Sequence, residues 1–269
     1  MKKEWKIFLT AVMYLTRIRV PATIDHRPEY LQQSPRYFPL VGWIVGGISA
    51  LAFLVANKIF SENIALLASI IAGILTTGAF HEDGFADSCD GFGGGWTKEK
   101  ILLIMKDSRL GTFGVIGLIS ILSAKFMALK ELPKFTPVSL DSTLHVFLNY
   151  HIFIGMVLTG HSLSRFMSVT VIQQYAYVTP DDNSKSKPVT SARLSLPSLL
   201  TAGLFGILPM VLLPPVFIFT LVPVVAARFL LAAYFNKWIG GYTGDCLGAL
   251  QQVTEIVFYL SCYLIWTYS

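Results

Sequence analysis

The sequence predicts an all-α integral membrane protein, a polytopic bundle of about seven transmembrane helices with short amphipathic helices at its surface. Of its 269 residues, 54% are hydrophobic and only 14% are charged, and the mean hydropathy is +0.60. A soluble domain carries charges on about a quarter of its residues. The apolar residues also fall into blocks close to the roughly 20 residues that cross a bilayer. We therefore expect one polytopic membrane domain over residues 1–269.

The individual elements follow from these blocks. Residues 3–20 predict an amphipathic helix along the membrane surface, because they carry too many charges to span the bilayer. A second short amphipathic helix is expected over 97–110, where Thr97 suits a helix start and Gly111 suits its end. Small residues in the first span should permit close helix packing. The expected spans are 38–57, 64–80, 112–129, 143–160, 196–213, 215–235 and 247–268.

The distribution of basic residues predicts the orientation. With the N-terminus inside and seven spans, 16 of the 21 Lys and Arg residues fall on the inner side, and three (Lys58, Lys130 and Lys134) fall on the outer side. This asymmetry follows the positive-inside rule and places the C-terminus outside. The segments expected to form active-site loops on the cytoplasmic side are 81–111, 161–195 and 236–246.

The most distinctive stretch is 81–95, which carries four carboxylates within nine residues. In a helix, Asp83, Asp87 and Asp90 would lie at i, i+4 and i+7, on one face. Carboxylates stacked in this way repel one another and raise each other's pKa values unless a cation neutralises them. Ligands that are all oxygens indicate a hard divalent ion, Mg²⁺ or Mn²⁺, rather than zinc.

A run of glycines, Gly93, Gly94 and Gly95, follows these carboxylates. Glycines let the backbone approach a bulky ligand closely and offer N–H groups to a phosphate. The alternative is a solvated acidic helix end followed by a flexible loop. A purely solvated loop, however, does not need apolar residues and glycines beside its carboxylates.

Other polar residues could complete a phosphate site. Asp107 and Arg109 lie just before the third span, and arginine is the natural bidentate partner of a phosphate. The alternative for Arg109 is a positive-inside anchor. Arg165 lies at the expected base of the fourth span. Asp245 opens the seventh span in a glycine-rich turn, either as part of the site or as a helix N-cap.

Three ionisable residues stand out near or within the spans. Glu255 lies about two turns inside the seventh span, where an ionisable group is a functional candidate by default. Lys125 is expected to extend its ammonium to the outer interface. His81 is a candidate ligand or base, and an interfacial histidine without a special role is the alternative.

The motifs of this chain resemble those of one family, the cobalamin synthases (adenosylcobinamide-GDP ribazoletransferases). Residues 81–91, His-Glu-Asp-Gly-Phe-Ala-Asp-Ser-Cys-Asp-Gly, resemble the family signature H-x-D-G-x-A-D-x-x-D-G. Glu82 departs from it, because an apolar residue is expected there; it either adds a ligand or faces water. Further segments resemble other family motifs, in order along nearly the whole chain: 15–21, 38–42, 106–112, 164–165 and 243–249.

The resemblance implies an inner-membrane, Mg²⁺-dependent enzyme with its active site facing the cytoplasm. Such enzymes join α-ribazole or its 5′-phosphate to adenosylcobinamide-GDP and release GMP, which completes the nucleotide loop of the cobamide. On this basis we assign three groups of residues. The expected metal ligands are Asp83, Asp87, Asp90 and Glu82, and the expected catalytic groups are His81, Asp107 and Arg109, with His81 or Asp107 as the base and Arg109 on the phosphate. The expected cofactor-binding groups are Gly93, Gly94, Gly95, Arg165 and Asp245, with the backbone of the three glycines on the phosphate.

The expected partners are these small-molecule substrates and membrane lipid, and no nucleic acid. A homo-oligomer and an association with other cobamide-assembly enzymes remain open.

Two other functions compete with this one. The D-x-x-D-G-x-x-A-R pattern of CDP-alcohol phosphatidyltransferases is half matched by residues 87–91, but Gly94 and Gly95 stand where Ala-Arg is required. A cation transporter would use the acidic cluster as its ion site. Transporter sites lie near the bilayer midplane on broken spans, whereas residues 83–90 are expected at a cytoplasmic end.

Overall fold

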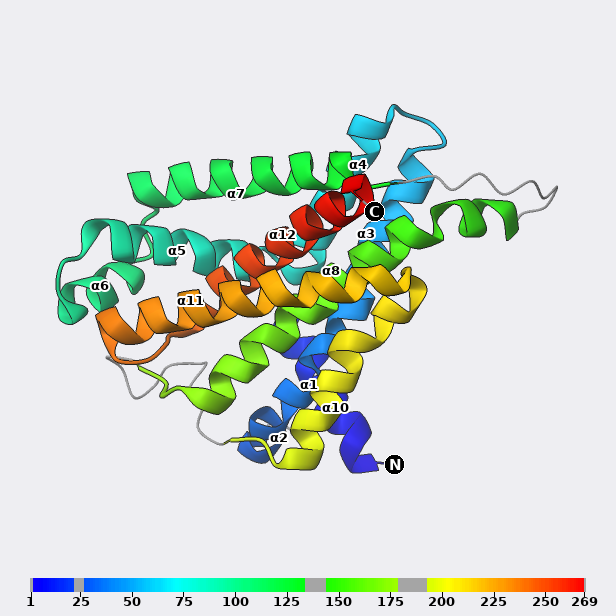
Figure 1. Cartoon of the computed structure of the whole chain (residues 1–269). Coiled ribbons are helices and arrows are strands. Elements are labelled where there is room, and N and C mark those ends of the chain that lie inside the picture. The colour runs from blue at the N-terminus through cyan, green and yellow to red at the C-terminus, as the bar shows by residue number, and fades with distance from the viewer. Residues whose placement is uncertain (1, 22–26, 134–143, 179–192, 269) are drawn as a thin grey trace.

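The computed structural model describes residues 2–21, 27–133, 144–178 and 193–268 (Figure 1). Regular structure within these ranges is helical, apart from an isolated backbone bridge between Tyr177 and Tyr242. The predicted all-α class is therefore confirmed. The loop predicted between the third and fourth spans, and most of the segment 173–195, lie outside the described ranges.

Most of the described residues lie in helices. The α-helices are α1 (Lys2–Leu15), α2 (Pro28–Gln33), α3 (Phe38–Ala56), α4 (Glu62–Thr77), α5 (Phe80–Gly94), α6 (Lys98–Met105), α7 (Thr112–Glu131), α8 (Leu144–Gln174), α10 (Leu196–Ile207), α11 (Leu221–Ile239) and α12 (Gly244–Tyr268). Short 3₁₀ segments are η1 (Ser34–Tyr37), η2 (Leu208–Leu212) and η3 (Pro215–Thr220).

Helix α6 begins where the sequence predicts but ends earlier. Thr97 caps α6 as expected, since its hydroxyl accepts a hydrogen bond from the backbone N–H of Lys100. The helix stops at Met105, however, and not at residue 110. Gly111 does not end it but is the residue before the first turn of α7.

Four helical stretches are long and apolar enough to cross a membrane: Pro28–Ala56, Thr112–Glu131, Tyr150–Gln174 and Pro215–Ile239. Helices α4 and α5 add a fifth if this pair, bent by 88°, is counted as one broken span. The predicted count of seven is not confirmed within the described part of the chain. Helix α12 is not among these stretches, because Gln251, Gln252 and Glu255 interrupt its apolar sequence.

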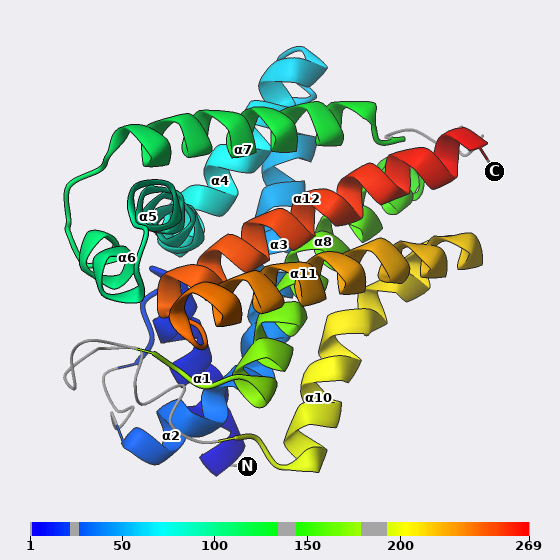
Figure 2. The ribbon, with the colours of Figure 1, turned by 60° about the vertical axis from the view of Figure 1, so that its left-hand side comes forward.

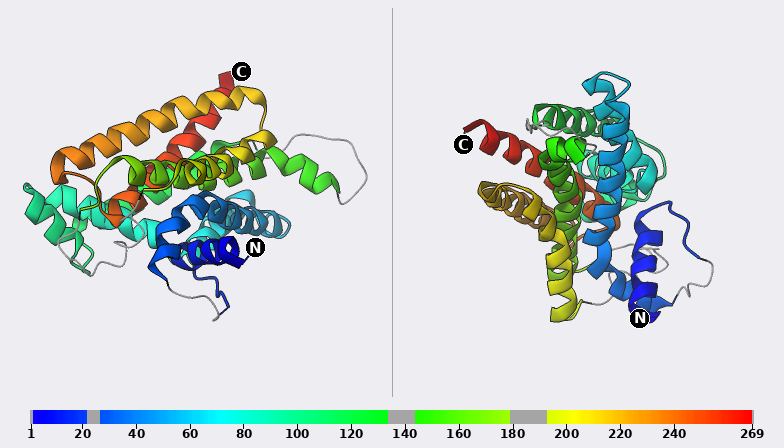
Figure 3. Two further views of the ribbon diagram at one scale, coloured as in Figure 1. Left: turned by 90° about the horizontal axis from the view of Figure 1, so that it is seen from below. Right: turned by 90° about the vertical axis from the view of Figure 1, so that its right-hand side faces the viewer.

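Helices α8 and α12 form the centre of the bundle (Figure 2). Helix α3 packs along α8 and α4, while α7 lies across α5 and α12 (Figure 3). A Cβ atom at Gly42 of α3 would lie only 2.5 Å from the carbonyl oxygen of His161 on α8. The predicted role of small residues in close packing is thus confirmed.

A sharp bend separates α4 from α5. Gly78 and Ala79 both adopt left-handed backbone conformations, with φ of 69° and 61°. This conformation is easy for glycine but costs energy for alanine, so the surrounding structure must hold it. The segment after α1 helps, because the backbone N–H of Arg17 donates to the carbonyl of Thr76. The bend turns the acidic signature sharply away from the direction of α4.

Two of the predicted loops, 81–111 and 161–195, are helical over much of the part that the structure describes. Residues 81–94 belong to α5, and residues 161–174 continue α8. Helix α8 runs beyond the expected boundary because other helices surround it, so polar residues such as Ser164 and Arg165 are buried within the bundle. Arg165 therefore lies inside a helix and not at the base of a span.

Candidate active site

The four carboxylates of α5 have four different surroundings. Glu82 and Asp90 are buried, Asp87 is half-buried and Asp83 is exposed. The helical spacing expected for the three aspartates is present, but neighbouring helices separate their functions. Asp90 points to α7, Glu82 points to α12, and Asp83 and Asp87 remain near the surface.

Asp90 binds the N-terminus of α7. Its two oxygens accept hydrogen bonds from the backbone N–H groups of Gly111 (2.7 Å) and Gly114 (2.8 Å). The first turn of a helix offers unpaired N–H groups and a partial positive charge, which a carboxylate satisfies. A Cβ atom at either glycine would lie within 2.5 Å of an Asp90 oxygen, which explains why glycine stands at both positions.

Glu82 lies on the inner side of α5. One of its oxygens accepts a 3.0 Å hydrogen bond from the side-chain amide of Gln252 on α12. The other oxygen, Oε2, is buried and accepts no hydrogen bond from the described part of the chain. Glu82 therefore does not face water, which was one of the two expectations for it.

Asp83 and Asp87 meet a third carboxylate, Asp245, at the start of α12. Asp87 experiences the negative charge of both Asp245 and Asp83. The backbones lie in direct contact here, since a Cβ atom at Gly84 would be 2.9 Å from the Cα of Asp245. We call Asp83, Asp87 and Asp245 the acidic cluster.

Asp245 is not the N-cap of α12. Thr243 has that role, because its hydroxyl accepts a hydrogen bond from the backbone N–H of Cys246. Burial raises the pKa of Asp245 to about 6, and the negative charge of Asp83 adds to the rise. The cluster thus concentrates negative charge where two helices meet, as a cation-binding site does.

The acidic cluster fits a hard cation by its chemistry but is not a preformed cage. Its ligands would be carboxylate oxygens, which suit Mg²⁺. Among the residues that the structure describes, no three His, Cys, Asp or Glu side chains are placed to hold a metal ion. Asp90 is engaged with α7 and Glu82 with α12. The metal and its ligands therefore stay a prediction.

The glycine run at the end of α5 serves helix packing. Gly93 and Gly94 are helical, and the N–H of Gly95 donates to the carbonyl of Gly91. A Cβ atom at Gly93 would lie 2.6 Å from the ring of Phe113, and one at Gly95 would lie 2.6 Å from Ile101. The alternative of a flexible loop is therefore wrong for Gly93 and Gly94, because both lie in α5 and α7 packs closely against this end of the helix. The phosphate-binding role expected for Gly93, Gly94 and Gly95 stays a prediction.

Asp107 and Arg109 form an exposed ion pair between α6 and α7. The guanidinium Nη2 lies 2.6 Å from Asp107 Oδ2, and Nε lies 3.0 Å from Oδ1. Arg109 lowers the pKa of Asp107 to about 2 through these hydrogen bonds, so Asp107 is a poor proton acceptor. With Lys100 and Lys106 the pair lines a surface hollow of about 560 Å³, here called the basic hollow.

His81 and Arg165 lie deeper in the bundle. Both line two small cavities, of about 20 and 30 Å³. Arg165 donates to the carbonyl oxygen of His161 at 2.8 Å, while its Nε has no partner within the described ranges. The structure thus places His81 and Arg165 together, on a buried wall and not in the basic hollow with Arg109.

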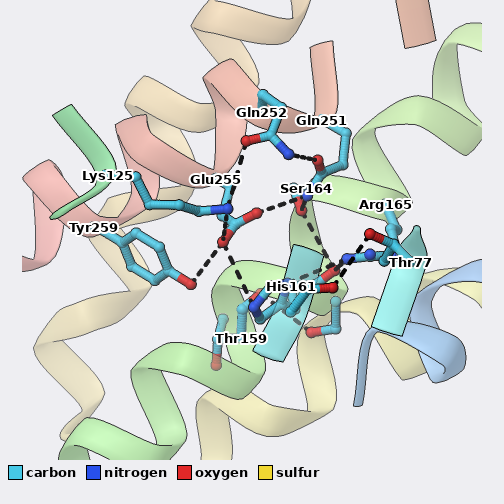
Figure 4. Close-up of polar contacts among 12 residues, drawn as sticks. Thr77, Lys125, Thr159, His161, Ser164, Arg165, Gln251, Gln252, Glu255 and Tyr259 are labelled. Atoms are coloured by element: carbon cyan, nitrogen blue, oxygen red, sulfur yellow. Dashed lines mark hydrogen bonds and ion pairs between the residues drawn. The ribbon is translucent and has the colours of Figure 1, made fainter. Parts of the chain in front are cut away.

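A buried polar network surrounds Glu255, which is fully buried (Figure 4). Lys125 Nζ lies 3.1 Å from Glu255 Oε1, and the hydroxyl of Tyr259 donates to the same oxygen at 3.0 Å. The amide of Gln251 donates to the other oxygen at 2.7 Å. The expectation that Lys125 reaches the outer interface is wrong, because Glu255 holds it inside the bundle.

Sequence reasoning missed several members of this network. His161 Nε2 lies 3.7 Å from Glu255, and Gln251 also donates to Ser164. The sequence does contain one signal for this network. Gln251, Glu255 and Tyr259 recur every four residues, which places them on one face of α12.

Comparison with known proteins identifies the family. The sequence profile of cobalamin-5-phosphate synthase matches residues 7–263. The chain belongs to the cobalamin-5-phosphate synthase family. The resemblance of the sequence motifs is thereby confirmed. No solved structure matches this chain.

Named relatives of this cobalamin-5-phosphate synthase family member cover almost its whole length. It is 42% identical to the adenosylcobinamide-GDP ribazoletransferase of Shewanella frigidimarina, over 96% of this chain and 94% of the relative. Identity to the enzyme of the same name from Shewanella amazonensis is 41%, over 100% and 98%. Identity to that from Leptospira interrogans is 38%, over 99% and 98%.

In this family member the signature segment 81–91 on α5 therefore supplies three kinds of contact. It gives two members of the acidic cluster, a carboxylate that fixes α7, and a carboxylate that joins α12. The T-G-D motif at 243–245 contributes the third member of the cluster. Segments far apart in the sequence thus meet where α5 crosses α12.

Proposed function

We propose that this chain is an adenosylcobinamide-GDP ribazoletransferase, which joins α-ribazole or its 5′-phosphate to adenosylcobinamide-GDP and releases GMP. A ribose hydroxyl attacks the phosphorus that carries the cobinamide. A new P–O bond forms, the P–O bond to GMP breaks, and the hydroxyl proton is released. The observation that carries this proposal is the family match over residues 7–263.

The match also favours this function over a CDP-alcohol phosphatidyltransferase or a cation transporter. The relatives that share about 40% identity over nearly the whole chain bear the ribazoletransferase name. The product, adenosylcobalamin or its 5′-phosphate, completes the assembly of the nucleotide loop.

In this proposal the acidic cluster binds Mg²⁺. Asp83, Asp87 and Asp245 would supply the oxygens, since Asp90 is committed to the N-terminus of α7. When bound, the ion supplies neutralisation of the charge on the diphosphate. The crowding of three carboxylates at the α5–α12 contact supports this role, because their mutual repulsion favours a cation.

The basic hollow would bind the diphosphate end of adenosylcobinamide-GDP. Arg109 is mostly exposed and offers a planar pair of donors to a phosphate. Asp107 holds the guanidinium in place, and its lowered pKa argues against the role of base that the sequence suggested. Lys100 and Lys106 add positive charge to the same surface.

We place this site on the cytoplasmic side of the inner membrane. The asymmetry of Lys and Arg residues along the sequence supports this orientation. The apolar outer faces of helices such as α4, α7 and α11 support membrane insertion.

The test is a reconstitution with defined substrates. Purified protein in lipid is incubated with adenosylcobinamide-GDP, with and without α-ribazole, and GMP and the cobamide product are quantified. We expect both products to appear in equal amounts, only when both substrates are present, and to disappear when EDTA removes divalent cations. Excess Mg²⁺ should restore them. GMP release without α-ribazole would indicate a hydrolase, and no cobamide under any condition would overturn the proposal.

A further inference from the structure

A buried charged residue outside the candidate active site lies in the apolar stretch Pro215–Ile239, which is long enough to cross a membrane. Arg228 on α11 is only 3% exposed. Its Nε and Nη2 donate to the hydroxyl and the carbonyl oxygen of Thr170 on α8, both at 2.8 Å. Its Nη1 is buried and has no hydrogen-bond partner among the residues that the structure describes. No carboxylate among the described residues pairs with this guanidinium, so its positive charge is uncompensated there.

An uncompensated charge within a transmembrane helix is costly and marks a functional site by default. Thr170 satisfies two of the donors but is neutral, so it cannot offset the charge. The protein keeps a full positive charge at this position where a neutral side chain could make the same bonds. An anion from outside the described chain would remove the cost.

Arg228 lies on the wall of a groove of about 390 Å³ between α8, α10 and α11. Apolar side chains form most of this wall, including Phe166, Leu199, Val225 and Phe229. We call it the α11 groove. The helices beside it turn apolar residues outward: Leu200 and Leu204 on α10 are 64% and 58% exposed, and Leu230 on α11 is 73% exposed. Helices α10 and α11 lie at the outside of the bundle (Figure 2). In a membrane their outward faces would contact lipid, so the groove would open to lipid.

The groove is polar at one end. Thr170, Gln173 and Gln174 line it, and α8 ends at Gln174, about one turn beyond Thr170. A polar, positively charged end followed by an apolar channel matches an amphiphile with an anionic head. Basic pockets between transmembrane helices are typical binding sites for anionic lipid head groups.

We propose that the α11 groove binds one anionic phospholipid, with its phosphate at the guanidinium of Arg228 and an acyl chain along α10 and α11. The ring of Phe229 lies 4.6 Å from the guanidinium carbon and is 51% exposed. Rotation of this side chain would open the guanidinium to the groove without a change in the backbone. Charge complementarity selects an anionic lipid over a zwitterionic one.

The test measures lipid retention by native mass spectrometry. The full-length protein is titrated with phosphatidylglycerol, with phosphatidylcholine, or with glycerol phosphate as a soluble head group. We expect one phosphatidylglycerol per chain, and neither phosphatidylcholine nor glycerol phosphate at the same concentrations. Arg228→Gln should weaken phosphatidylglycerol binding about tenfold, as expected for the loss of a charge-assisted contact. Lys237→Gln removes an exposed positive charge from the same helix and should leave retention unchanged.

Further results would overturn the proposal that the α11 groove binds an anionic phospholipid. Equal retention by the wild type and Arg228→Gln, or equal binding of both lipids by the wild type, would overturn the proposal and leave Arg228 as a clamp between α8 and α11. If Arg228→Gln does not fold, Val225→Trp provides the second test, because it fills the groove and keeps the bonds to Thr170. Wild-type phosphatidylglycerol retention by Val225→Trp would equally overturn the proposal.

Discussion

Asp90 and Gly114 join α5, which carries two members of the acidic cluster, to α7. The Asp90 carboxylate on α5 accepts a 2.8 Å hydrogen bond from the backbone N–H of Gly114 in the first turn of α7. The most conspicuous acid of the signature is therefore occupied by the protein itself. A metal-binding role and a structural role can be separated experimentally on this basis.

We expect Asp90→Ala to lower stability and Asp87→Asn to lower activity. Removal of the Asp90 carboxylate leaves two buried N–H groups of α7 unpaired, which should cost about 1–2 kcal/mol, as the loss of a helix cap does. Asp87→Asn removes charge from the acidic cluster without breaking such a contact. Thermal unfolding and GMP release of both variants give the comparison. An Asp87→Asn enzyme with normal turnover at saturating Mg²⁺ would contradict the proposed metal site.

The Lys125–Glu255 pair should be a strongly coupled unit. Lys125→Met leaves a buried carboxylate without its cation, so we expect a loss of about 3–5 kcal/mol. The double variant with Glu255→Gln should recover much of this loss, because neither charge is then unpaired. Lys130→Met on the exposed end of α7 is the matched control. Additive effects in thermal unfolding would show that the pair is not coupled.

The ionisation of Asp245 should contribute to the pH dependence of stability. The pKa of its carboxyl is raised from 3.8 to about 6, so ionised Asp245 opposes folding. This penalty is present above pH 6 and disappears as the pH falls from about 6 to about 4. In EDTA, the wild type should therefore gain stability relative to Asp245→Asn as the pH is lowered from 7 to 4. Parallel curves for the two proteins would remove Asp245 from the cluster.

Arg109→Lys tests the basic hollow. Lysine keeps the charge but not the planar pair of donors, and it retains the positive-inside anchor. We expect kcat/KM for adenosylcobinamide-GDP to fall about tenfold, while KM for α-ribazole changes little. Arg27→Lys, at an exposed position outside the hollow, is the control. Unchanged kinetics for both substrates would leave Arg109 as an anchor only.

The topology can be tested with reporter fusions. Truncations after Leu132 and after Gly240 should place the reporter on opposite sides of the membrane, outside and inside respectively. The reason is the excess of basic residues in the segments expected inside. A reporter on the same side in both fusions would contradict the seven-span orientation and the cytoplasmic site.

The sequence was sufficient for the fold class and the family, because hydropathy and the motif at 81–91 are local properties. It was not sufficient for the partners of buried polar groups. Lys125 looked like an interfacial residue, since a sequence does not show that Glu255 faces it from another helix. Likewise the spacing of Asp83, Asp87 and Asp90 was read correctly as one helical region. The hydrogen bonds between Asp90 and the first turn of α7, which separate Asp90 from the other two aspartates, depend on tertiary contacts alone.

The glycine run illustrates the same limit. Glycine permits both a mobile loop and the closest helix packing, and only the neighbouring helices decide between them. Here Phe113 and Ile101 occupy the space that side chains at Gly93 and Gly95 would need.

The contact of α5 with α12 has a further consequence. At Gly84 and Gly248 no side chain separates the two backbones, and a Cβ atom at Gly248 would lie 3.1 Å from the carbonyl oxygen of His81. The spacing of the acidic cluster is thus set by main-chain atoms, which do not change rotamer. One added methyl group at Gly84 would act as a wedge and shift Asp245 bodily relative to Asp83 and Asp87. If the acidic cluster binds Mg²⁺ as proposed, the absence of two side chains would limit how far apart its ligands can lie and hence the size of ion that it accepts.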